Sequence, residues 1–413
     1  MHIVIVNRWP RFSGSTRWDN ELTRYEEFID HDRHQVSYVV DPAGEAGVLV
    51  DPAKIACLVR IDDVNVFEQL RGAVAEVIEK VGPAGQLIAL SEFTLEIAAR
   101  VREDLGIPGP GPADVAVYRD KVRMKEILAA AGFRVPPFAP CRDAAHAVEF
   151  ARQHGYPVIL KPVDGAGSIG VHRADDEAAL TALLAQADLA RYEIEEFIEG
   201  TIYHVDGYAD AGSGVPFQVA ARYVNDCLVF AEEGAPLGSV VMQRSALRDR
   251  IEEYCRACIA ALGMRAVPFH LELFITPADE LVFLEIGGRV GGSEVPHLLN
   301  RLFGVNLFEI WLREASGDPV GVPAKSGDPS GGWLVIPKPA GLPGRVLRST
   351  PMRDQVATVW RELVPSPGEV LEPGGSYDSL HSGRFILLGA EQDRVEADIR
   401  TIIDTFKCEV APL

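Results

Sequence analysis

The sequence predicts an α/β domain followed by α+β domains, and three observations indicate this fold class. The chain has 413 residues, which at about 150 residues per domain corresponds to two or three domains. Its first hundred residues alternate strand-like and helix-like patterns, which is typical of an α/β sheet. From residue 158 onward, β-rich stretches are interspersed with short helices, which favours an α+β arrangement.

The first predicted domain covers residues 1–112. Runs of β-branched residues predict strands, and apolar side chains at helical spacing predict helices. The predicted strands are residues 3–6, 36–40, 55–59 and 87–90, and the predicted helices are residues 20–29 and 64–79. The Gly- and Pro-rich run 106–112 breaks all periodicity, so we place the boundary at residue 112.

The second predicted domain covers residues 113–315 and begins with a helix over 114–131. Its remaining elements are strands at 158–161, 171–173, 192–197, 204–208 and 217–223, a helix at 251–262, and a hairpin of 269–275 and 281–286. Residues 316–332 contain five Gly and three Pro, which predicts a linker. Residues 333–413 then predict a small C-terminal α+β appendage, with strands at 333–336 and 385–388 and a helix at 392–406.

Charge and cysteine usage narrow the possible partners and the compartment. The net charge of −20 would repel nucleic acid and anionic membranes, and no apolar run approaches the ~18 residues of a transmembrane helix. The amino terminus lacks the basic segment of an export signal, and the six cysteines are scattered, so we expect reduced thiols and a cytoplasmic protein. Cys255 and Cys258 lack a second ligand pair, which favours core packing over metal or redox chemistry.

The hairpin 269–286 is the strongest chemical signal. In each arm, alternation places Leu271, Leu273 and Ile275, or Val282, Leu284 and Ile286, on one face, and leaves His270, Glu272, Glu285, Gly287 and Arg289 on the other. A turn centred between residues 278 and 279 puts Glu272 opposite Glu285. Two facing carboxylates repel each other unless a cation lies between them, and Mg²⁺ prefers such oxygen ligands. The alternative is an exposed sheet face with two solvated glutamates.

A glycine-rich loop follows the predicted strand that ends at Lys161. Residues 165–170 contain G-x-G-x-x-G, but a dinucleotide fingerprint needs a helix after the glycines, and here a strand follows. The loop therefore predicts a hairpin flap whose backbone N–H groups approach phosphates beside the Lys161 charge. A surface hairpin with turn glycines is the alternative. Downstream, the segment 192–200 ends in acidic residues that could read an adenine edge or a ribose.

The ordered set of Lys121, Lys161 before the flap, Glu195-Glu196-Phe197-Ile198, Glu272 and Glu285-Ile286-Gly287-Gly288-Arg289 resembles the ATP-grasp superfamily over residues 113–315. The resemblance implies ATP and Mg²⁺, with Mn²⁺ as a substitute, bound between two lobes that follow a pre-ATP-grasp α/β domain. It further implies nucleotide contacts from Lys121, Lys161, Gly165, Gly167, Ser168, Gly170, Glu195, Phe197 and Ile198, metal ligation by Glu272 and Glu285, and a phosphoryl and acyl-phosphate contact from Arg289.

Three positions depart from this pattern. Gly287 stands where many relatives carry a metal-binding Asn, and residues 201–204 lack the ribose-binding Glu. The chain is most similar to carboxylate–amine ligases of the L-amino-acid ligase type, which implies substrate contacts from Glu232 and Arg289, but Ala235 replaces a His expected in dipeptide-forming members.

The expected function is therefore an ADP-forming ligase that joins a small carboxylate, most simply an amino acid, to an amine through an acyl phosphate, with Lys161 and Arg289 as catalytic residues. The expected partners are these small molecules, and a homodimer is left open. Two alternatives remain at this point: a biotin-carboxylase-like carboxylase and a non-catalytic ATP-binding regulatory protein. The short flap and the retained set of charged residues favour the ligase.

Overall fold

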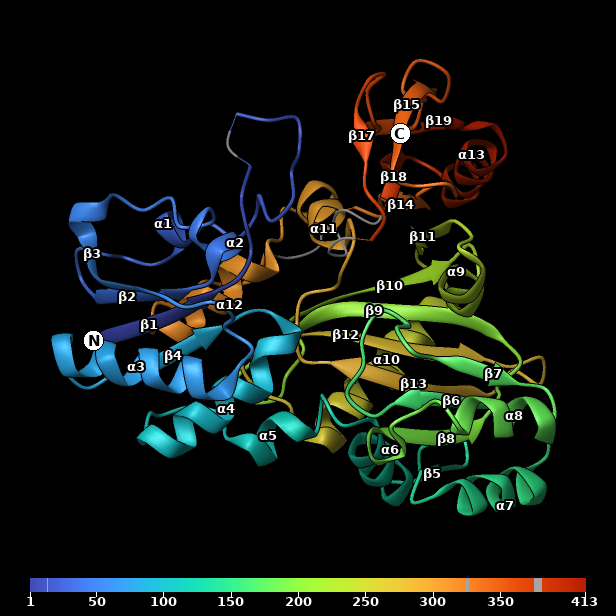
Figure 1. Ribbon diagram of the computed structural model, residues 1–413, viewed down its shortest axis with the longest axis horizontal. Helices are drawn as coiled ribbons and strands as arrows, with labels where there is room; N and C mark the ends of the chain where they lie inside the picture. Colours follow the sequence, from blue (N-terminus) through green and yellow to red (C-terminus); the bar gives the residue numbers. More distant parts are fainter. Residues whose placement is uncertain (13, 324–326, 375–380) are drawn as a thin grey trace.

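The computed structural model describes residues 1–12, 14–323, 327–374 and 381–413, and the side chains of residues 231–233 are not part of the description. The described chain forms four sheets, whose strands are labelled in Figure 1. Within these residues, no helix combines the length and the apolar character needed to cross a membrane.

The N-terminal domain is a four-stranded parallel sheet in the order β3-β2-β1-β4. Its elements are β1 (His2–Asn7), α1 (Tyr25–Phe28), β2 (Gln35–Val40), α2 (Pro42–Glu45), β3 (Ile55–Arg60), α3 (Phe67–Val81), β4 (Gln86–Ala89), α4 (Glu92–Leu105) and α5 (Pro112–Ala116). The four predicted strands are confirmed, whereas the helix predicted over 20–29 is reduced to the single turn of α1. Helices α3 and α4 cover one face of the sheet.

The other face of this sheet is covered from far along the chain. Helix α12 (Leu307–Ser316) packs against β4 and α1, and its buried residues share one apolar core with Ile5, Tyr38 and Ile88. Figure 1 shows α12 in orange beside the blue N-terminal strands. The apolar run of a parallel strand needs cover on both faces, which explains this arrangement. The N-terminal domain is therefore completed by a helix of the next domain.

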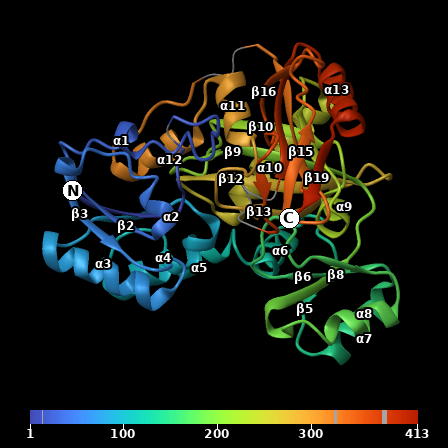
Figure 2. The ribbon, with the colours of Figure 1, turned by 45° about the horizontal axis from the view of Figure 1, so that its top comes forward.

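The small lobe contains an antiparallel sheet in the order β5-β8-β6-β7, with the helices 144–154 and 177–184 packed on one face and the helix 121–130 contacting the other. Its elements are α6 (Lys121–Ala130), β5 (Phe138–Pro140), α7 (Ala144–His154), β6 (Val158–Pro162), β7 (His172–Ala174), α8 (Glu177–Leu184) and β8 (Tyr192–Glu196). The helix predicted over 114–131 is in fact two helices, α5 and α6. Figure 2 shows this lobe projecting below the larger sheet.

The large lobe is an eight-stranded antiparallel sheet in the order β13-β12-β9-β10-β11-β14-β18-β16. Its elements are β9 (Thr201–Ala209), β10 (Phe217–Tyr223), α9 (Cys227–Glu233), β11 (Leu237–Val241), α10 (Ala246–Leu262), β12 (Val267–Ile275), β13 (Leu281–Gly287), α11 (Val295–Phe303), β14 (Ser330–Pro337), β16 (Val359–Leu363) and β18 (His381–Gly389). Cys255 and Cys258 of α10 are fully buried in its core, as expected.

The C-terminal segment is continuous with this sheet. Strand β14 pairs with β11, so the proposed boundary at residue 333 falls inside a strand of the large-lobe sheet. Helix α13 (Gln392–Thr405) covers the extension, and β15 (Gly344–Ser349), β17 (Val370–Leu371) and β19 (Cys408–Pro412) form a separate three-stranded sheet. The helix predicted at 392–406 is confirmed.

The hairpin of β12 and β13 has the expected functional register but a different turn. His270 pairs with Gly287 and Glu272 pairs with Glu285, as predicted. Beyond Glu272, however, Leu273 pairs with Phe283, because a β-bulge leaves Leu284 without an opposite residue. The prediction that Val282 and Leu284 lie on the core face is therefore wrong: Phe283 is buried in the core opposite Leu273, Val282 pairs with the pocket-lining Phe274, and Leu284 lines the pocket described below.

Buried ion pairs and a hydrogen bond join the N-terminal domain, the large lobe and the C-terminal segment. Arg384 of β18 binds Glu294, which precedes α11, with an Nε–Oε1 distance of 2.5 Å, and it also binds Asp19 of the N-terminal domain. Trp18 donates its indole N–H to the second oxygen of Glu294 at 2.5 Å. These contacts fix the start of α11 beside the central pocket.

Candidate active site

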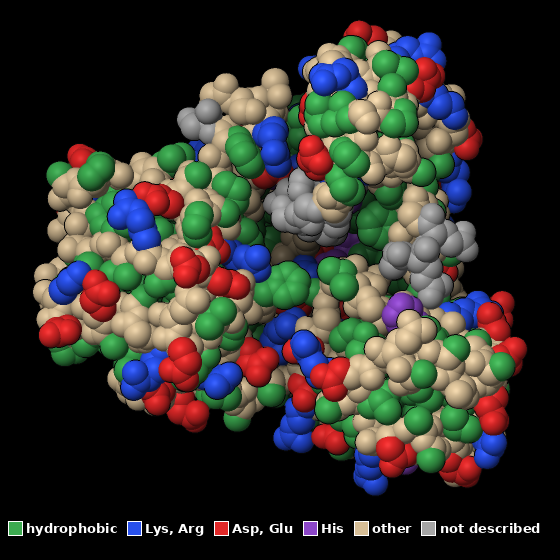
Figure 3. Space-filling view, viewed as in Figure 1, with side chains coloured by type: hydrophobic (Ala, Val, Ile, Leu, Met, Phe, Trp, Pro, Cys, Tyr) green, Lys and Arg blue, Asp and Glu red, His purple; other side chains and the backbone are tan. Residues whose placement is uncertain are grey.

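One pocket of about 280 Å³ lies between the small lobe and the large lobe. Figure 3 shows the molecular face hollowed between the N-terminal domain, the C-terminal strands and the small lobe. The lining includes every predicted nucleotide, metal and phosphoryl residue, namely Lys121, Lys161, Gly165, Gly167, Ser168, Glu195, Phe197, Ile198, Glu272, Glu285 and Arg289, except Gly170. The predicted residues therefore converge on one cavity, although they come from four separate stretches of the chain.

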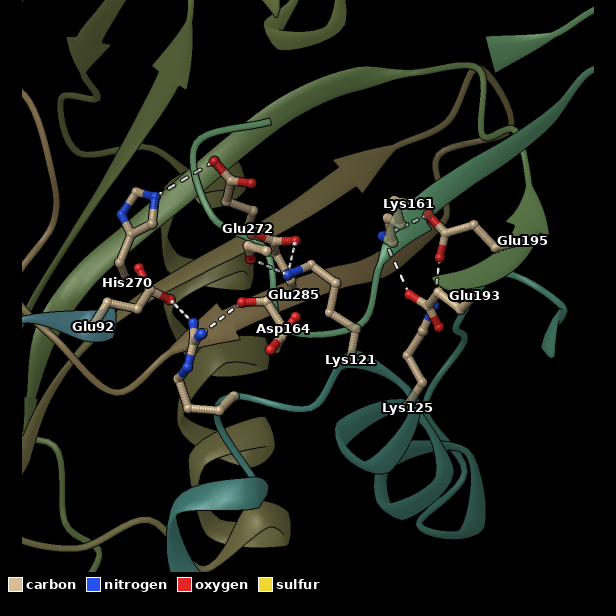
Figure 4. Close-up of polar contacts among 12 residues, drawn as sticks. Glu92, Lys121, Lys125, Lys161, Asp164, Glu193, Glu195, His270, Glu272 and Glu285 are labelled. Atoms are coloured by element: carbon tan, nitrogen blue, oxygen red, sulfur yellow. Dashed lines mark hydrogen bonds and ion pairs between the residues drawn. The ribbon is translucent and has the colours of Figure 1, made fainter. Parts of the chain in front are cut away.

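Two lysines and two glutamates form a buried ionic cluster in the small lobe. Lys161 of β6 lies 2.6 Å from Glu195 and 3.8 Å from Glu193 of β8, and Lys125 of α6 lies 2.8 Å from Glu193 and also contacts Glu195. Figure 4 shows both lysines directed at this carboxylate pair. Burial favours the neutral carboxyl group, but the two ammonium groups lower the pKa of Glu195 below its ordinary value.

This cluster fixes the Lys161 side chain at the pocket wall. Burial alone would lower the pKa of Lys161, but the Glu195 and Glu193 carboxylates raise it above its ordinary value, so the ammonium stays charged. The structure thus places the Glu195 carboxylate against lysines. Sequence reasoning missed the roles of Lys125 and Glu193, although Lys125 is one helical turn after Lys121 and Glu193 is on the same strand face as Glu195.

Lys121 connects the flap to Glu285, one of the two predicted metal ligands. It is the first residue of α6, and its ammonium donates to the Gly165 carbonyl at 2.6 Å and lies 3.3 Å from Glu285. The flap itself turns through Gly167, Ser168 and Gly170, all with positive φ between 58° and 74°. Because Ser168 tolerates this backbone poorly, the conformation is set by the tight turn rather than by residue preference. The strand β7 leaves the flap, so the predicted hairpin is confirmed.

Glu272 and Glu285 offer oxygen atoms suited to a divalent cation. Tyr223 donates to Glu272 Oε1 at 2.7 Å, and His270 lies 3.4 Å from the same atom, whereas Lys121 approaches Glu285 Oε2. Within the described residues, the second oxygen of each carboxylate has no protein partner. Two facing carboxylates, each with one free oxygen, are the donors that Mg²⁺ prefers, so the residues present fit this ion.

A polar chain continues from Glu272 into the sheet. His270 Nδ1 lies 2.9 Å from Asp206, and Asp206 lies 2.7 Å from His204 Nδ1. Burial opposes charge on these groups, but Asp206 and Glu272 raise the pKa of His270 to about 9, and His270 and Tyr223 lower the pKa of Glu272 to about 2. Glu272 is therefore held ionised, and it is fixed in direction by partners behind it. The sequence had placed His270 on this face without a role.

Arg289 follows the hairpin and lines the pocket. Its Nε donates to Glu92 of α4 at 2.6 Å, and one terminal nitrogen donates to the Val290 carbonyl at 3.1 Å. Burial would weaken the charged form, but Glu92 raises the pKa of Arg289 above its ordinary value. The guanidinium is therefore charged, and among the described residues only its Nε and one terminal nitrogen have hydrogen-bond partners.

The remaining predicted residues are those expected to contact the adenine base, the ribose and the carboxylate substrate. Phe197 and Ile198 line the pocket, with the Arg173 guanidinium 4.4 Å above the Phe197 ring, and the Phe197 N–H donates to Pro157. His204, in the segment that lacks the ribose-binding Glu, points into the buried polar chain. The predicted substrate contact of Glu232 lies outside the described side chains.

Comparisons with known proteins show which family the chain resembles. The ATP-grasp domain family profile matches residues 154–297. The chain is 30% identical over 295 residues to a D-alanine–D-alanine ligase of Streptomyces coelicolor, covering 65% of this chain and 69% of that protein. It is 25% identical over 259 residues to an L-arginine-specific L-amino acid ligase of Bacillus subtilis, covering 60% of this chain and 62% of the relative.

The fold agrees over the whole length. The crystal structure of an L-amino acid ligase from Bacillus licheniformis superposes with a TM-score of 0.74 at 18% identity, covering 99% of this chain and 98% of that chain. The chain belongs to the ATP-grasp family. It spans less than two thirds of the length of the B. subtilis ligase, so its activity and substrates are matters for proposal.

Proposed function

We propose that this protein is an ADP-forming ligase that joins a small carboxylate to an amine, with ATP and Mg²⁺ as cofactors and an amino acid as the expected carboxylate. The observation that carries the proposal is the single pocket that combines the anchored Lys161, the facing Glu272 and Glu285, and the Arg289 guanidinium. The names of the curated relatives and of the superposed ligase support the same reaction class.

The reaction has two balanced steps. A carboxylate oxygen attacks the γ-phosphorus of ATP, the bond to the β–γ bridging oxygen breaks, and ADP leaves with that oxygen. The amine nitrogen then attacks the carbonyl carbon of the acyl phosphate, phosphate leaves with one former carboxylate oxygen, and the nitrogen loses a proton. Phosphorylation is needed because a carboxylate is a poor electrophile and has no good leaving group.

The chain's own residues would mainly position groups and balance charge. Lys161 and Lys121 present ammonium groups to the nucleotide phosphates, and the flap would cover these phosphates and exclude water. Arg289 can make paired hydrogen bonds to two phosphoryl oxygens while charge moves from ATP to the acyl phosphate. Mg²⁺, when bound by Glu272 and Glu285, would neutralise part of the negative charge on the phosphate oxygens.

The pocket has an apolar end beyond the metal carboxylates. Tyr223, Leu237 and Trp333, on three neighbouring strands, line this end together with Val295, and Tyr223 meets Trp333 edge to face at 6.3 Å between ring centroids. Arg289 also lines the pocket, so a carboxylate bound to it could direct its apolar part toward this end. We propose that the activated carboxylate occupies this end of the pocket.

Oxygen-18 transfer tests the reaction directly. The protein is incubated with ATP, Mg²⁺ and a pool of uniformly ¹⁸O-carboxyl-labelled amino acids, and both ADP and the isotopic mass of the released phosphate are measured. We expect amino-acid-dependent ADP release and one ¹⁸O atom in each phosphate. ADP release that requires bicarbonate instead would indicate a carboxylase, and tight ATP binding without hydrolysis would indicate a regulatory protein; either result would contradict the ligase.

A further inference from the structure

Glu92 lies behind Arg289 and comes from a different domain. It is the first residue of α4 in the N-terminal domain, and its side chain is 12% exposed. Its Oε2 accepts from Arg289 Nε at 2.6 Å, and its Oε1 accepts from Arg119 at 2.8 Å. Both carboxylate oxygens are thus engaged by guanidinium groups, and the helix N-terminus further favours the negative charge.

This contact determines how Arg289 faces the pocket. The Nε edge is bound to Glu92 and one N–H is bound to Val290, which leaves the remaining donors for a ligand. Arg289 lines the pocket, whereas Glu92 does not. A carboxylate that binds the Nε edge of a guanidinium fixes the plane of that group. Paired hydrogen bonds to two phosphate oxygens require the guanidinium plane to be aimed at the phosphate. Glu92 therefore acts through Arg289 rather than on a ligand.

Gly287 makes room for this pair. It ends β13 on the same face as Glu285, and a Cβ built there would lie 3.3 Å from Glu92 Oε1 and 3.4 Å from Arg289 Cγ. The first of these contacts is tighter than about nine in ten Cβ contacts in proteins. The Glu92 carboxylate thus occupies the space beside β13 into which a longer side chain at residue 287 would project. This gives a physical reason for glycine, rather than the asparagine of the family pattern, at this position.

Arg119 extends the link to the phosphate flap. One of its terminal nitrogens binds Glu92, and the other donates to the carbonyl of Asp164 at 2.5 Å, directly before Gly165. One carboxylate from the N-terminal domain therefore holds the phosphoryl arginine and, through Arg119, the base of the flap. Figure 4 shows Glu92 and Asp164 linked to the same guanidinium by dashed contacts.

We propose that Glu92 is a positioning residue that orients Arg289 toward the transferring phosphoryl group, so that phosphoryl transfer depends on docking of the N-terminal domain. The proposal rests on the function proposed above, because it requires Arg289 to contact that group. It assigns a role in the reaction to a residue outside the two ATP-grasp lobes.

A double-mutant cycle tests the coupling. Glu92→Gln keeps the shape but loses the charge, and we expect kcat to fall about tenfold while KM for ATP changes less than about twofold. In an Arg289→Lys background, which lacks the Nε edge, Glu92→Gln should lower kcat less than about twofold further. Glu96→Gln, on the exposed side of the same helix, is the matched control and should leave kcat unchanged. Losses that multiply in the double variant would overturn the proposal.

A binding measurement separates this proposal from the proposed function. ADP with Mg²⁺ and aluminium fluoride mimics the transferring phosphoryl group, and its affinity can be measured without turnover. We expect Glu92→Gln to weaken this complex about tenfold and to leave the affinity for ADP with Mg²⁺ unchanged. Equal weakening of both complexes would mean that Glu92 acts on the metal or the fold, and would overturn the proposal. Absence of ligase turnover in the unmodified protein would contradict the proposed function alone.

Discussion

Lys161 and Glu195 form a buried ion pair of 2.6 Å whose carboxylate also binds Lys125. Glu193 completes the group, in which burial raises the pKa of Glu193 while the two lysines lower the pKa of Glu195. The two lysines differ in position: Lys161 lines the pocket, whereas Lys125 is fully buried behind it. The chain thereby keeps a charged lysine at the pocket wall, where burial alone would disfavour the charge.

Removal of Lys125 should destabilise the fold severely. Lys125→Met leaves the Glu193 and Glu195 carboxylates undercompensated in the interior, and breaking such a pair typically costs about 3–5 kcal/mol. Urea unfolding followed by circular dichroism would measure this loss. The control is Lys80→Met, which removes an exposed partner of Glu76 and should leave the midpoint unchanged. Equal midpoints for both variants would contradict the assigned role of the cluster.

Glu272 and Glu285 should both be needed for turnover that depends on Mg²⁺. Glu272→Gln and Glu285→Gln each remove one anionic ligand, so we expect kcat to fall at least about a hundredfold and more Mg²⁺ or Mn²⁺ to be needed for half-maximal rate. Glu280→Gln, in the exposed turn of the same hairpin, is the control. Chelation with EDTA should abolish the activity of the unmodified protein. Near-normal turnover in both variants would remove the metal assignment.

The flap should become ordered when nucleotide binds. Gly165, Gly167 and Gly170 have high backbone entropy and little side-chain packing, so their amides should exchange rapidly in the free protein. Hydrogen exchange with mass spectrometry should show slower exchange over residues 165–170 on addition of ATP and Mg²⁺, while the turn 276–280 stays unchanged. Identical flap exchange in both states would favour an ordinary surface hairpin.

Glu92 should contribute stability that acid removes. Burial raises its pKa, but Arg289 and Arg119 lower it to about 2, below the ~4.5 of an unfolded chain. The contribution, up to about 3 kcal/mol, is therefore fully present above pH ~4.5 and is lost as pH falls toward 2. Urea titrations at pH 6 and pH 3 should show the gap between the unmodified protein and Glu92→Gln narrowing at the lower pH. A constant gap would be inconsistent with this pKa.

Trp333 should influence which carboxylate is accepted. Trp333→Ala enlarges the apolar end of the pocket, so kcat/KM should shift toward bulkier apolar carboxylates by about 10-fold relative to small ones, in line with the ~1–3 kcal/mol carried by small apolar changes. KM for ATP should stay unchanged. A substrate panel scored by ADP release measures the shift, and an unchanged order of preference would exclude this end as the carboxylate site.

Local patterns in the sequence were sufficient for the four N-terminal strands and for the pairing of Glu272 with Glu285, but not for α4 or for the helix bounds over 20–29 and 114–131. Period-two alternation put Glu272 opposite Glu285 because both residues lie on one face of adjacent arms. The same pattern was wrong at Leu284, because a bulge adds one residue to β13 and turns the side chains on its far side to the opposite faces of the sheet. Alternation cannot reveal a bulge, because it assumes an unbroken period.

The other missed features depend on contacts between distant residues. Glu92 meets Arg289 across 197 positions, and Asp19 meets Arg384 across 365, and neither pair has a local signature. The position of Lys125 could have been predicted from the sequence, because its four-residue spacing from Lys121 places both lysines on one side of α6. Charged residues whose partners come from another domain can be found only when the tertiary packing is known.

The cover that α12 provides for the N-terminal sheet also affects how the chain folds during synthesis. Strand β4 leaves the ribosome about two hundred residues before α12 is complete, which corresponds to roughly 10–40 seconds at usual elongation rates. Throughout this interval, the face of the nascent sheet that carries Ile5, Tyr38 and Ile88 has the cover of residues 18–29 but lacks the cover that α12 supplies. The nascent chain is therefore expected to expose an apolar surface of the kind that chaperones bind until the large lobe has been translated.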